Sequence, residues 1–215
     1  MSDIVDVYDL DLTLLDTERR WFGPVLVELG RFAGLPKVEV EQRFAECNRT
    51  TFTFPSFFRA LGIDERLWPT LERRLRADLA SRANACLYED VVPVLASRAR
   101  VARLVLVTAG NEAWQRWKFD QLTDLHPFFA PEDRHFVPLN GSKADCIALY
   151  GDASRMSFQD DSPTWLAEAR DQVPGIRLVR VMMRGRSPAT DHPGDGRVWD
   201  VACSMAEIHA ILRRD

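Results

Sequence analysis

The sequence has no excess of basic residues, which argues against nucleic acid as a partner. It carries 28 lysine and arginine residues against 32 aspartate and glutamate residues, giving a formal net charge of −4. Nucleic-acid-binding proteins usually carry clustered positive charge. Two small groups of arginines occur, Arg73, Arg74 and Arg76, and Arg98, Arg100 and Arg103. We interpret each group as part of a solvated helix face.

Long apolar runs and organised cysteines are also lacking. No run approaches the roughly 20 apolar residues that cross a bilayer, so we expect no membrane partner. Met1-Ser2-Asp3-Ile4 lacks the basic and apolar regions of a secretion signal. The cysteines form no Cys-x-x-Cys pair, and we interpret each as a small buried residue; they are Cys47, Cys86, Cys146 and Cys203. These absences predict a protein of the reducing cytoplasm.

Short apolar runs are present instead, and they are rich in valine, isoleucine or leucine. They are Ile4–Tyr8, Arg103–Val107, Phe136–Leu139, Met156–Phe158 and Ile176–Met183. Such runs are typical of buried parallel strands, which need not alternate in polarity. Helices are expected between the later runs, with N-caps at Asn111, Ser142, Ser162 and Ser204. The alternation predicts an α/β fold with a doubly wound, Rossmann-like parallel sheet.

The stretch from about Thr17 to Tyr88 breaks this alternation. Apolar residues recur there at helical spacing, in segments that end at glycines such as Gly34 and Gly62. We therefore expect an inserted all-α cap domain at residues 17–88, and an α/β catalytic core formed by residues 1–16 and 89–215.

The most informative motif follows the first apolar run and reads Asp-x-Asp-x-Thr, with Asp9, Asp11 and Thr13. Ligands of open α/β sheets bind in the crevice at the carboxyl ends of the strands. Two carboxylates there favour Mg²⁺, which prefers oxygen ligands. Alone, the motif also fits a helix-capping turn. A calcium loop of the EF-hand type needs glycine where Leu14 stands.

Three later segments place further polar groups at the same edge. Thr108 ends the strongest apolar run, and the N–H groups of Ala109 and Gly110 could hold a phosphate at a helix start. Lys143 lies in the first turn of a helix, where a cation opposes the helix dipole. Helix stability therefore does not account for a lysine at this position. Lys118 is the other candidate for the lysine of this site, but we interpret it as a surface residue of a helix.

Asp160 and Asp161 form the last of these segments. One of them could cap the following helix, but two adjacent carboxylates at a strand end repel each other unless a cation compensates them. A cation between this pair and Asp9 would provide that compensation.

Taken together, these motifs resemble the haloacid dehalogenase-like hydrolase superfamily, and the likeness runs through the whole chain. The helical insertion resembles the helical cap of that family. The segments Gln115–Phe119 and His126–Phe129 resemble family segments after the threonine motif, and Val198 to Leu212 resembles the last strand and helix. The sequence departs from the family at Leu12, where glycine or aspartate is usual.

The resemblance implies a role for each polar residue. Asp9 would be the nucleophile that forms an aspartyl-phosphate. Asp11 would protonate the leaving oxygen and later activate water. Thr108 and the backbone of Ala109 and Gly110 would hold the phosphoryl oxygens, while Lys143 would neutralise negative charge.

The resemblance also implies Mg²⁺ as the cofactor. Its ligands would be the Asp9 carboxylate, the Asp11 carbonyl and Asp160 or Asp161. The partner would be a small-molecule phosphate ester, and Arg49 between cap helices could bind its leaving group. The equal alternative for that stretch is an interhelical turn with Phe52 and Phe54 in the core of the cap.

The predicted function is therefore Mg²⁺-dependent phosphomonoester hydrolysis. Asp11 favours a phosphate ester over a haloacid, since halide departs unprotonated. A phosphomutase on the same core and a non-catalytic Mg²⁺ or phosphate-binding protein remain alternatives. A signalling receiver domain is about half this length and places its acceptor aspartate after a middle strand.

Overall fold

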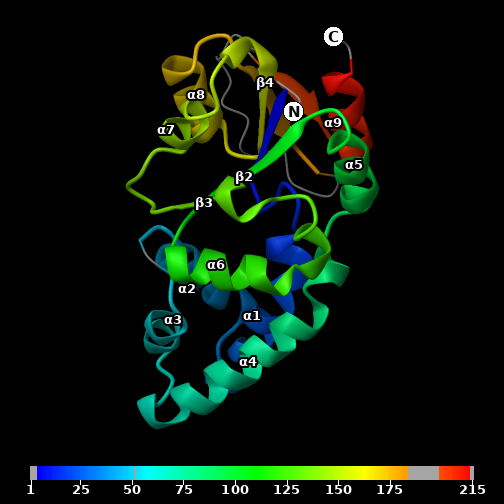
Figure 1. Cartoon of the computed structure of the whole chain (residues 1–215). Helices are drawn as coiled ribbons and strands as arrows, with labels where there is room; N and C mark the ends of the chain where they lie inside the picture. Colours follow the sequence, from blue (N-terminus) through cyan, green and yellow to red (C-terminus); the bar gives the residue numbers. More distant parts are fainter. Residues whose placement is uncertain (1–3, 51, 184–198, 214–215) are drawn as a thin grey trace.

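The computed structural model describes residues 4–50, 52–183 and 199–213. Six parallel strands form one sheet in this part of the chain, in the order β3-β2-β1-β4-β5-β6 (Figure 1). Their bounds are β1 (Val5–Tyr8), β2 (Arg103–Ala109), β3 (Arg134–Val137), β4 (Met156–Asp160), β5 (Arg177–Val181) and β6 (Asp200–Ala202). β1 and β4 are buried along their length, and β2 is buried except at its two end residues, which suits their near-continuous apolar sequences. The predicted α/β class is confirmed.

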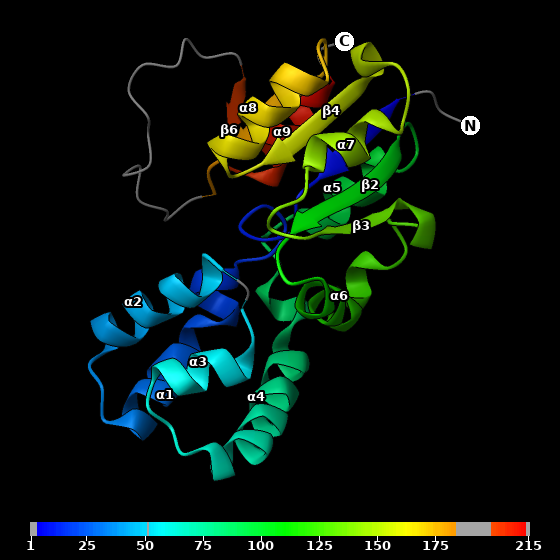
Figure 2. The same ribbon diagram turned by 90° about the vertical axis from the view of Figure 1, so that its left-hand side faces the viewer.

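Helices cover both faces of this sheet (Figure 2). One face packs against α5 (Val91–Arg98) and α9 (Met205–Leu212), and the other against α7 (Lys143–Ala148) and α8 (Pro163–Gln172). Helix α6 (Glu112–Gln121) joins the same apolar cluster as α5 and α9. Two separate apolar clusters, one on each side, are what a doubly wound sheet produces.

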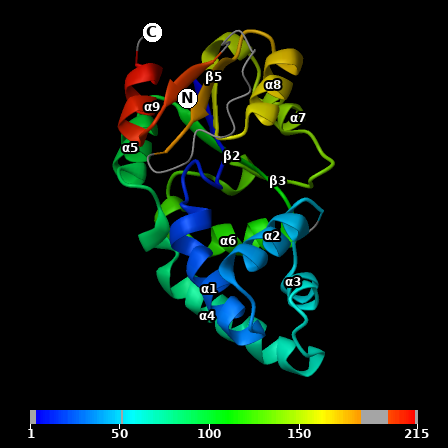
Figure 3. The ribbon, with the colours of Figure 1, turned by 180° about the vertical axis from the view of Figure 1, so that it is seen from behind.

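Four further helices lie together on the far side of α6 from the sheet (Figures 1 and 3). We call this group the helical cap; it comprises α1 (Gly23–Ala33), α2 (Lys37–Asn48), α3 (Phe54–Ala60) and α4 (Trp68–Arg82). A π-helical turn, Thr17–Trp21, leads into it from the first strand. The domain division at residues 16/17 and 88/89 stays a prediction.

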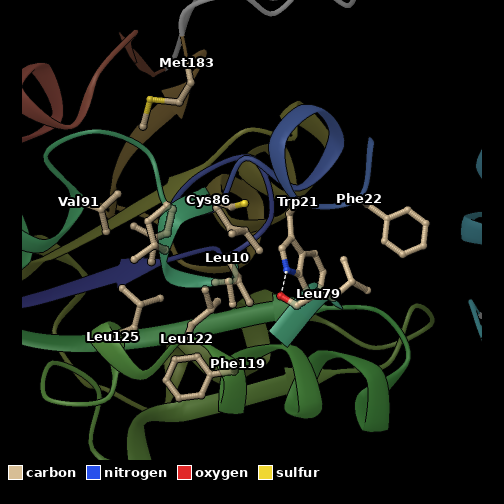
Figure 4. Close-up of a cluster of buried hydrophobic side chains, with 14 of the residues drawn as sticks. Leu10, Trp21, Phe22, Leu79, Cys86, Val91, Phe119, Leu122, Leu125 and Met183 are labelled. Carbon is tan, nitrogen blue, oxygen red and sulfur yellow. Dashed lines mark hydrogen bonds between the residues drawn. The ribbon is translucent and has the colours of Figure 1, made fainter. Parts of the chain in front are cut away.

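Aromatic side chains connect the cap with the core. The Trp21 indole N–H donates a hydrogen bond to the carbonyl of Leu79 on α4, at 3.0 Å (Figure 4). The same ring lies 5.7 Å from Trp114 and 6.1 Å from Trp117, measured between centroids. Because both tryptophans belong to α6, this helix is the surface on which the cap rests.

The observed elements differ from the expected ones at three places. The third strand is Arg134–Val137 rather than 136–139, since Pro138 lacks the N–H that would continue the ladder. Helix α5 was not predicted from the sequence, because Pro93 interrupts its apolar run; proline is tolerated there in the first turn. The sequence predicts Asp64 as the N-cap of the long helix in the insertion. Instead, Asp64 caps a short 3₁₀ turn, Glu65–Leu67, and the long helix begins after it at Trp68.

The interpretations of the second arginine group and of the cysteines were wrong. Arg103 lies on no helix, because it begins β2, where it pairs with Asp133. Arg98 does not lie on a solvated helix face, because it is buried and paired with Asp6. Only Cys86 is buried, whereas the other three cysteines are half-buried; all four are free thiols.

Two further points concern the ends of the expected elements. Val198, the first residue of the expected last strand, lies outside the described residues. Among the residues that are described, no helix combines the length and apolar character needed to cross a membrane.

Candidate functional site

The predicted site residues follow three adjacent strands at one edge of the sheet. Strand β1 lies between β2 and β4, so the residues at the carboxyl ends of all three face one crevice. Asp9 comes one residue after β1, Thr108 stands near the end of β2, and Asp160 ends β4. The Asp9 N–H donates to the carbonyl of Gln159, at 2.9 Å, which fixes the Asp9 backbone to β4.

Three carboxylates converge in this crevice. Asp9, Asp160 and Asp161 each offer an oxygen, and these oxygens lie within 4.8 Å of one another. Asp9 and Asp160 are buried, and Asp161 is half-buried. The Asp160 carboxylate also accepts a hydrogen bond from the Ser162 N–H, at 2.7 Å. Ser162 is the N-cap residue of α8, as expected, but its side chain makes no capping bond to the helix.

Lys143 joins two of these carboxylates. Its ammonium donates to Asp9 Oδ1 at 2.6 Å and to Asp160 Oδ2 at 2.7 Å. Only 2% of its side chain is exposed. The position in the first turn of α7, unfavourable for the helix dipole, is therefore explained by the carboxylates that it contacts.

Burial and the neighbouring charges shift the pKa values of both Asp9 and Lys143. Burial raises the pKa of the Asp9 carboxyl well above its usual range. Lys143 opposes this change, but the carboxylates of Asp160, Asp161 and Asp11 raise the pKa further. For Lys143, burial lowers the pKa, but Asp160 and Asp9 outweigh it, so its pKa lies above the usual value.

This donor set fits a hard divalent cation. Magnesium takes oxygen ligands and commonly uses one or two carboxylates while waters and phosphate fill its other positions. Asp9, Asp160 and Asp161 supply such oxygens. The predicted use of the Asp11 carbonyl as a fourth ligand stays a prediction.

The carboxylate of Asp11 is held by a different set of groups. Lys118 Nζ contacts both of its oxygens, at 2.6 and 2.5 Å. Thr17 Oγ1 donates to Oδ1 at 2.5 Å, and Gln115 Nε2 donates to Oδ2 at 3.0 Å. Burial raises the pKa of Asp11, but Lys118 and the hydrogen bonds from Lys118, Thr17 and Gln115 outweigh it and hold the pKa below its usual range.

Lys118 was therefore interpreted wrongly from the sequence. It is 2% exposed and paired with Asp11, and it does not lie on the surface of α6. Its spacing of three from Gln115 places both side chains on one helix face. That spacing indicates a shared face, but it does not identify Asp11 as the partner.

Thr108 has the features of an available donor. Its side chain is 1% exposed, and its hydroxyl has no hydrogen-bond partner among the described residues. An unpaired buried hydroxyl is costly unless a ligand satisfies it.

The backbone of the same loop is less available than the sequence suggested. The Gly110 N–H donates to the Val137 carbonyl at 2.8 Å, so this N–H is engaged in the sheet, and its use as a phosphate donor stays a prediction. Gly110 itself is required for another reason. Its φ is +151°, and a Cβ there would lie 2.7 Å from Gln115 Nε2. Ala109 ends β2 beside it and accepts a hydrogen bond from Gln115 at its carbonyl.

A cavity of about 240 Å³ adjoins Asp11, between the core and the cap. Its core side includes Gly110, Gln115 and Lys118. Its cap side is mainly aromatic and includes Trp21, Phe22, Phe44 and Phe52, together with the polar Asn48.

Arg49 is not among the residues that line this cavity and is exposed at the end of α2. Its proposed contact with substrate stays untested. Phe52 and Phe54 of the same stretch are buried among the cap aromatics, as the alternative interpretation of this stretch expected.

Leu12 lies between the two catalytic candidates in a left-handed backbone conformation, with φ of +61°. This is the position where the sequence departs from the glycine or aspartate of the resembling family. For an L-residue with a side chain, this conformation costs roughly 1–2 kcal/mol. The loop thus carries local strain beside the site.

Leu12→Gly is expected to raise the free energy of unfolding by about 1 kcal/mol, because glycine adopts this conformation without strain. Urea unfolding would measure the change. The matched control is Leu67→Gly, at an exposed residue with φ of −89°, where glycine should lower stability by about 0.5–1 kcal/mol. Equal losses in both variants would contradict the strain at Leu12.

Comparison with known proteins agrees with this architecture. The sequence matches no protein-family model and no curated protein. Solved structures match over nearly the whole chain. The Bacillus subtilis protein YfnB, described as a HAD-hydrolase and bound to magnesium, has a TM-score of 0.67 at 15% identity, covering 99% of this chain and 100% of its own.

Two other matches carry different activities in their names. A protein described as a phosphoglycolate phosphatase from Lactobacillus plantarum has a TM-score of 0.57 at 13% identity, covering 98% of this chain and 100% of its own. A dehalogenase has a TM-score of 0.64 at 17% identity, covering 99% and 98%. The chain therefore has the fold of the haloacid dehalogenase-like hydrolases, as the motifs led us to expect, and the fold is compatible with more than one chemistry.

Proposed function

We propose that the chain is a haloacid dehalogenase-like hydrolase that cleaves small phosphate monoesters with the help of Mg²⁺. The observation that carries the proposal is the cluster of Asp9, Asp160 and Asp161. Lys143 pairs with the first two, and a second acid, Asp11, follows Asp9 by two residues. The likeness of fold supports it, and the names of the matching proteins include both a phosphatase and a dehalogenase.

In this proposal Asp9 attacks phosphorus and forms an aspartyl-phosphate, which water then hydrolyses. Lys143 contacts Asp9 and holds its oxygen in place, and its charge lowers the repulsion between the attacking carboxylate and the anionic phosphate. When bound at Asp9, Asp160 and Asp161, Mg²⁺ would supply positive charge to the phosphoryl oxygens.

Asp11 is the proton-transfer residue of the proposal. It gives a proton to the leaving oxygen in the first step and takes one from water in the second. Its lowered pKa suits the second step directly, while an arriving phosphate dianion favours the protonated form needed for the first. A dehalogenase does not need this acid, since halide leaves as an anion.

The test of the proposal is Mg²⁺-dependent release of phosphate from 4-nitrophenyl phosphate. Activity should disappear with EDTA and return when Mg²⁺ is added in excess. A 2-chlorocarboxylate serves as the competing substrate. Chloride release without phosphate release would replace the phosphatase with a dehalogenase, and a protein inert toward both would contradict the enzymatic proposal.

Thr108→Val should lower kcat/KM for such an ester by about a hundredfold, the typical loss when one oxyanion donor is removed. Valine has nearly the shape of threonine, and the lost hydroxyl has no protein partner among the described residues, so stability should hold. Steady-state kinetics and a melting curve would measure both. A loss below about threefold would mean that Thr108 does not contact the phosphoryl group.

A further inference from the structure

The carboxylate of Asp11 is fixed in direction by three donors. Two come from one face of α6, Lys118 and Gln115, and the third is Thr17 at the entry to the cap. Gln115 Nε2 also donates to the carbonyl of Ala109 at 2.9 Å, so the end of β2 anchors the amide that holds Asp11. Both carboxylate oxygens are engaged, which leaves Asp11 little freedom to rotate.

A lysine in this place is expensive for the fold. Removing an ammonium from water costs several kcal/mol in proteins, and only 2% of Lys118 is exposed. Its charge is compensated by Asp11 and by the face of the Trp21 ring, whose centroid lies 5.7 Å from Nζ. Two apolar residues in place of both Lys118 and Asp11 would avoid this cost, so packing alone does not account for the pair.

The position of this group relative to the cavity points to a use. Asp11, Gln115 and Lys118 all line the cavity of about 240 Å³ between core and cap. In the proposed reaction the leaving group occupies the space next to Asp11. The donors of α6 therefore set the direction from which Asp11 meets the leaving oxygen.

We propose that Lys118 is a positioning residue which, together with Gln115, aims Asp11 at the leaving oxygen of the substrate. The inference rests on the proposed phosphatase function. As the bond from Asp9 to phosphorus forms, the bond from phosphorus to the leaving oxygen breaks, and the proton of Asp11 passes to that oxygen. Lys118 transfers no proton; it stabilises the carboxylate that Asp11 becomes.

The leaving group provides a readout that a merely structural lysine would not change. Phenyl phosphate releases a phenolate whose conjugate acid has a pKa of about 10, as in tyrosine, so its departure needs a proton. The anion released from 4-nitrophenyl phosphate is far more stable and needs little help. Since kcat/KM reports phosphoryl transfer to Asp9, its ratio for the two esters isolates the proton transfer.

For Lys118→Met we expect kcat/KM to fall about a hundredfold with phenyl phosphate and less than about tenfold with 4-nitrophenyl phosphate. Lys118→Arg, which keeps the charge, should recover part of the loss with phenyl phosphate. Gln115→Met should show a smaller change in the same direction, and it decides the question if Lys118→Met does not fold. The control is Lys37→Met on the cap, an exposed lysine that pairs with Glu41 at 3.4 Å; its ratio should equal that of the wild type.

The outcomes separate the inference from the function on which it rests. Equal losses with both esters, or none, in a folded Lys118→Met or Gln115→Met variant would overturn the positioning role while the phosphatase stands. A wild-type protein that cleaves neither ester overturns the proposed function, and the positioning role with it.

Discussion

Asp9→Asn is expected to lower kcat for phosphate ester hydrolysis by roughly 10⁴-fold or more, because an amide cannot serve as the nucleophile. The substitution is nearly isosteric. Asp9 is buried among carboxylates that raise its pKa, so a neutral side chain relieves repulsion there. Steady-state kinetics with 4-nitrophenyl phosphate would measure the loss.

The stability of this variant is the necessary control. Lys143 keeps its contact with Asp160 at 2.7 Å when Asp9 is neutral, so the melting temperature should equal or exceed that of the wild type. A folded Asp9→Asn variant with activity within about tenfold of the wild type would remove Asp9 from the nucleophile role.

Arg98→Met is expected to lower the free energy of unfolding by about 3–5 kcal/mol, the typical cost of leaving one partner of a buried ion pair uncompensated. Asp6 on β1 is 1% exposed. Its carboxylate accepts from Arg98 Nε at 2.7 Å, from Arg98 Nη2 at 3.2 Å and from the Ser157 hydroxyl at 2.7 Å. Without Arg98, the serine alone faces a buried charge. Denaturant unfolding would measure the change.

The double variant Asp6→Leu with Arg98→Met is the matched control for this pair. Removing both charges avoids the buried unpaired carboxylate, so most of the lost stability should return. The pair would be shown to matter little if Arg98→Met alone cost less than about 1 kcal/mol. Neither Arg98 nor Asp6 is hydrogen-bonded to Asp9, so the folded fraction should largely keep the kcat of the wild type.

The carboxyl edge of the sheet could be predicted from the sequence because simple rules govern it. Parallel strands end at one edge, so polar residues after separate apolar runs must meet. This placed Asp9, Lys143, Asp160 and Asp161 together correctly. The same rule could not orient side chains, and the Gly110 N–H turned out to donate to Val137.

The residues that pair with buried charged side chains were harder to predict from the sequence. Arg98 and Lys118 lie in polar stretches that read as solvated helix faces, and burial depends on how the helix packs. In the sequence, Lys118 is 107 residues from Asp11 and Arg98 is 92 residues from Asp6. Local patterns carry no information on such pairs, since they depend on the tertiary arrangement.

The central claim is that Asp9 carries the phosphoryl group during turnover. Acid-quenched enzyme, mixed with Mg²⁺ and 4-nitrophenyl phosphate, can be treated with borohydride, which reduces an aspartyl-phosphate to homoserine. Peptide mass spectrometry should then find this conversion at Asp9, and in no peptide of enzyme quenched without substrate. Phosphate release without any such conversion, or conversion at another aspartate, would contradict the account.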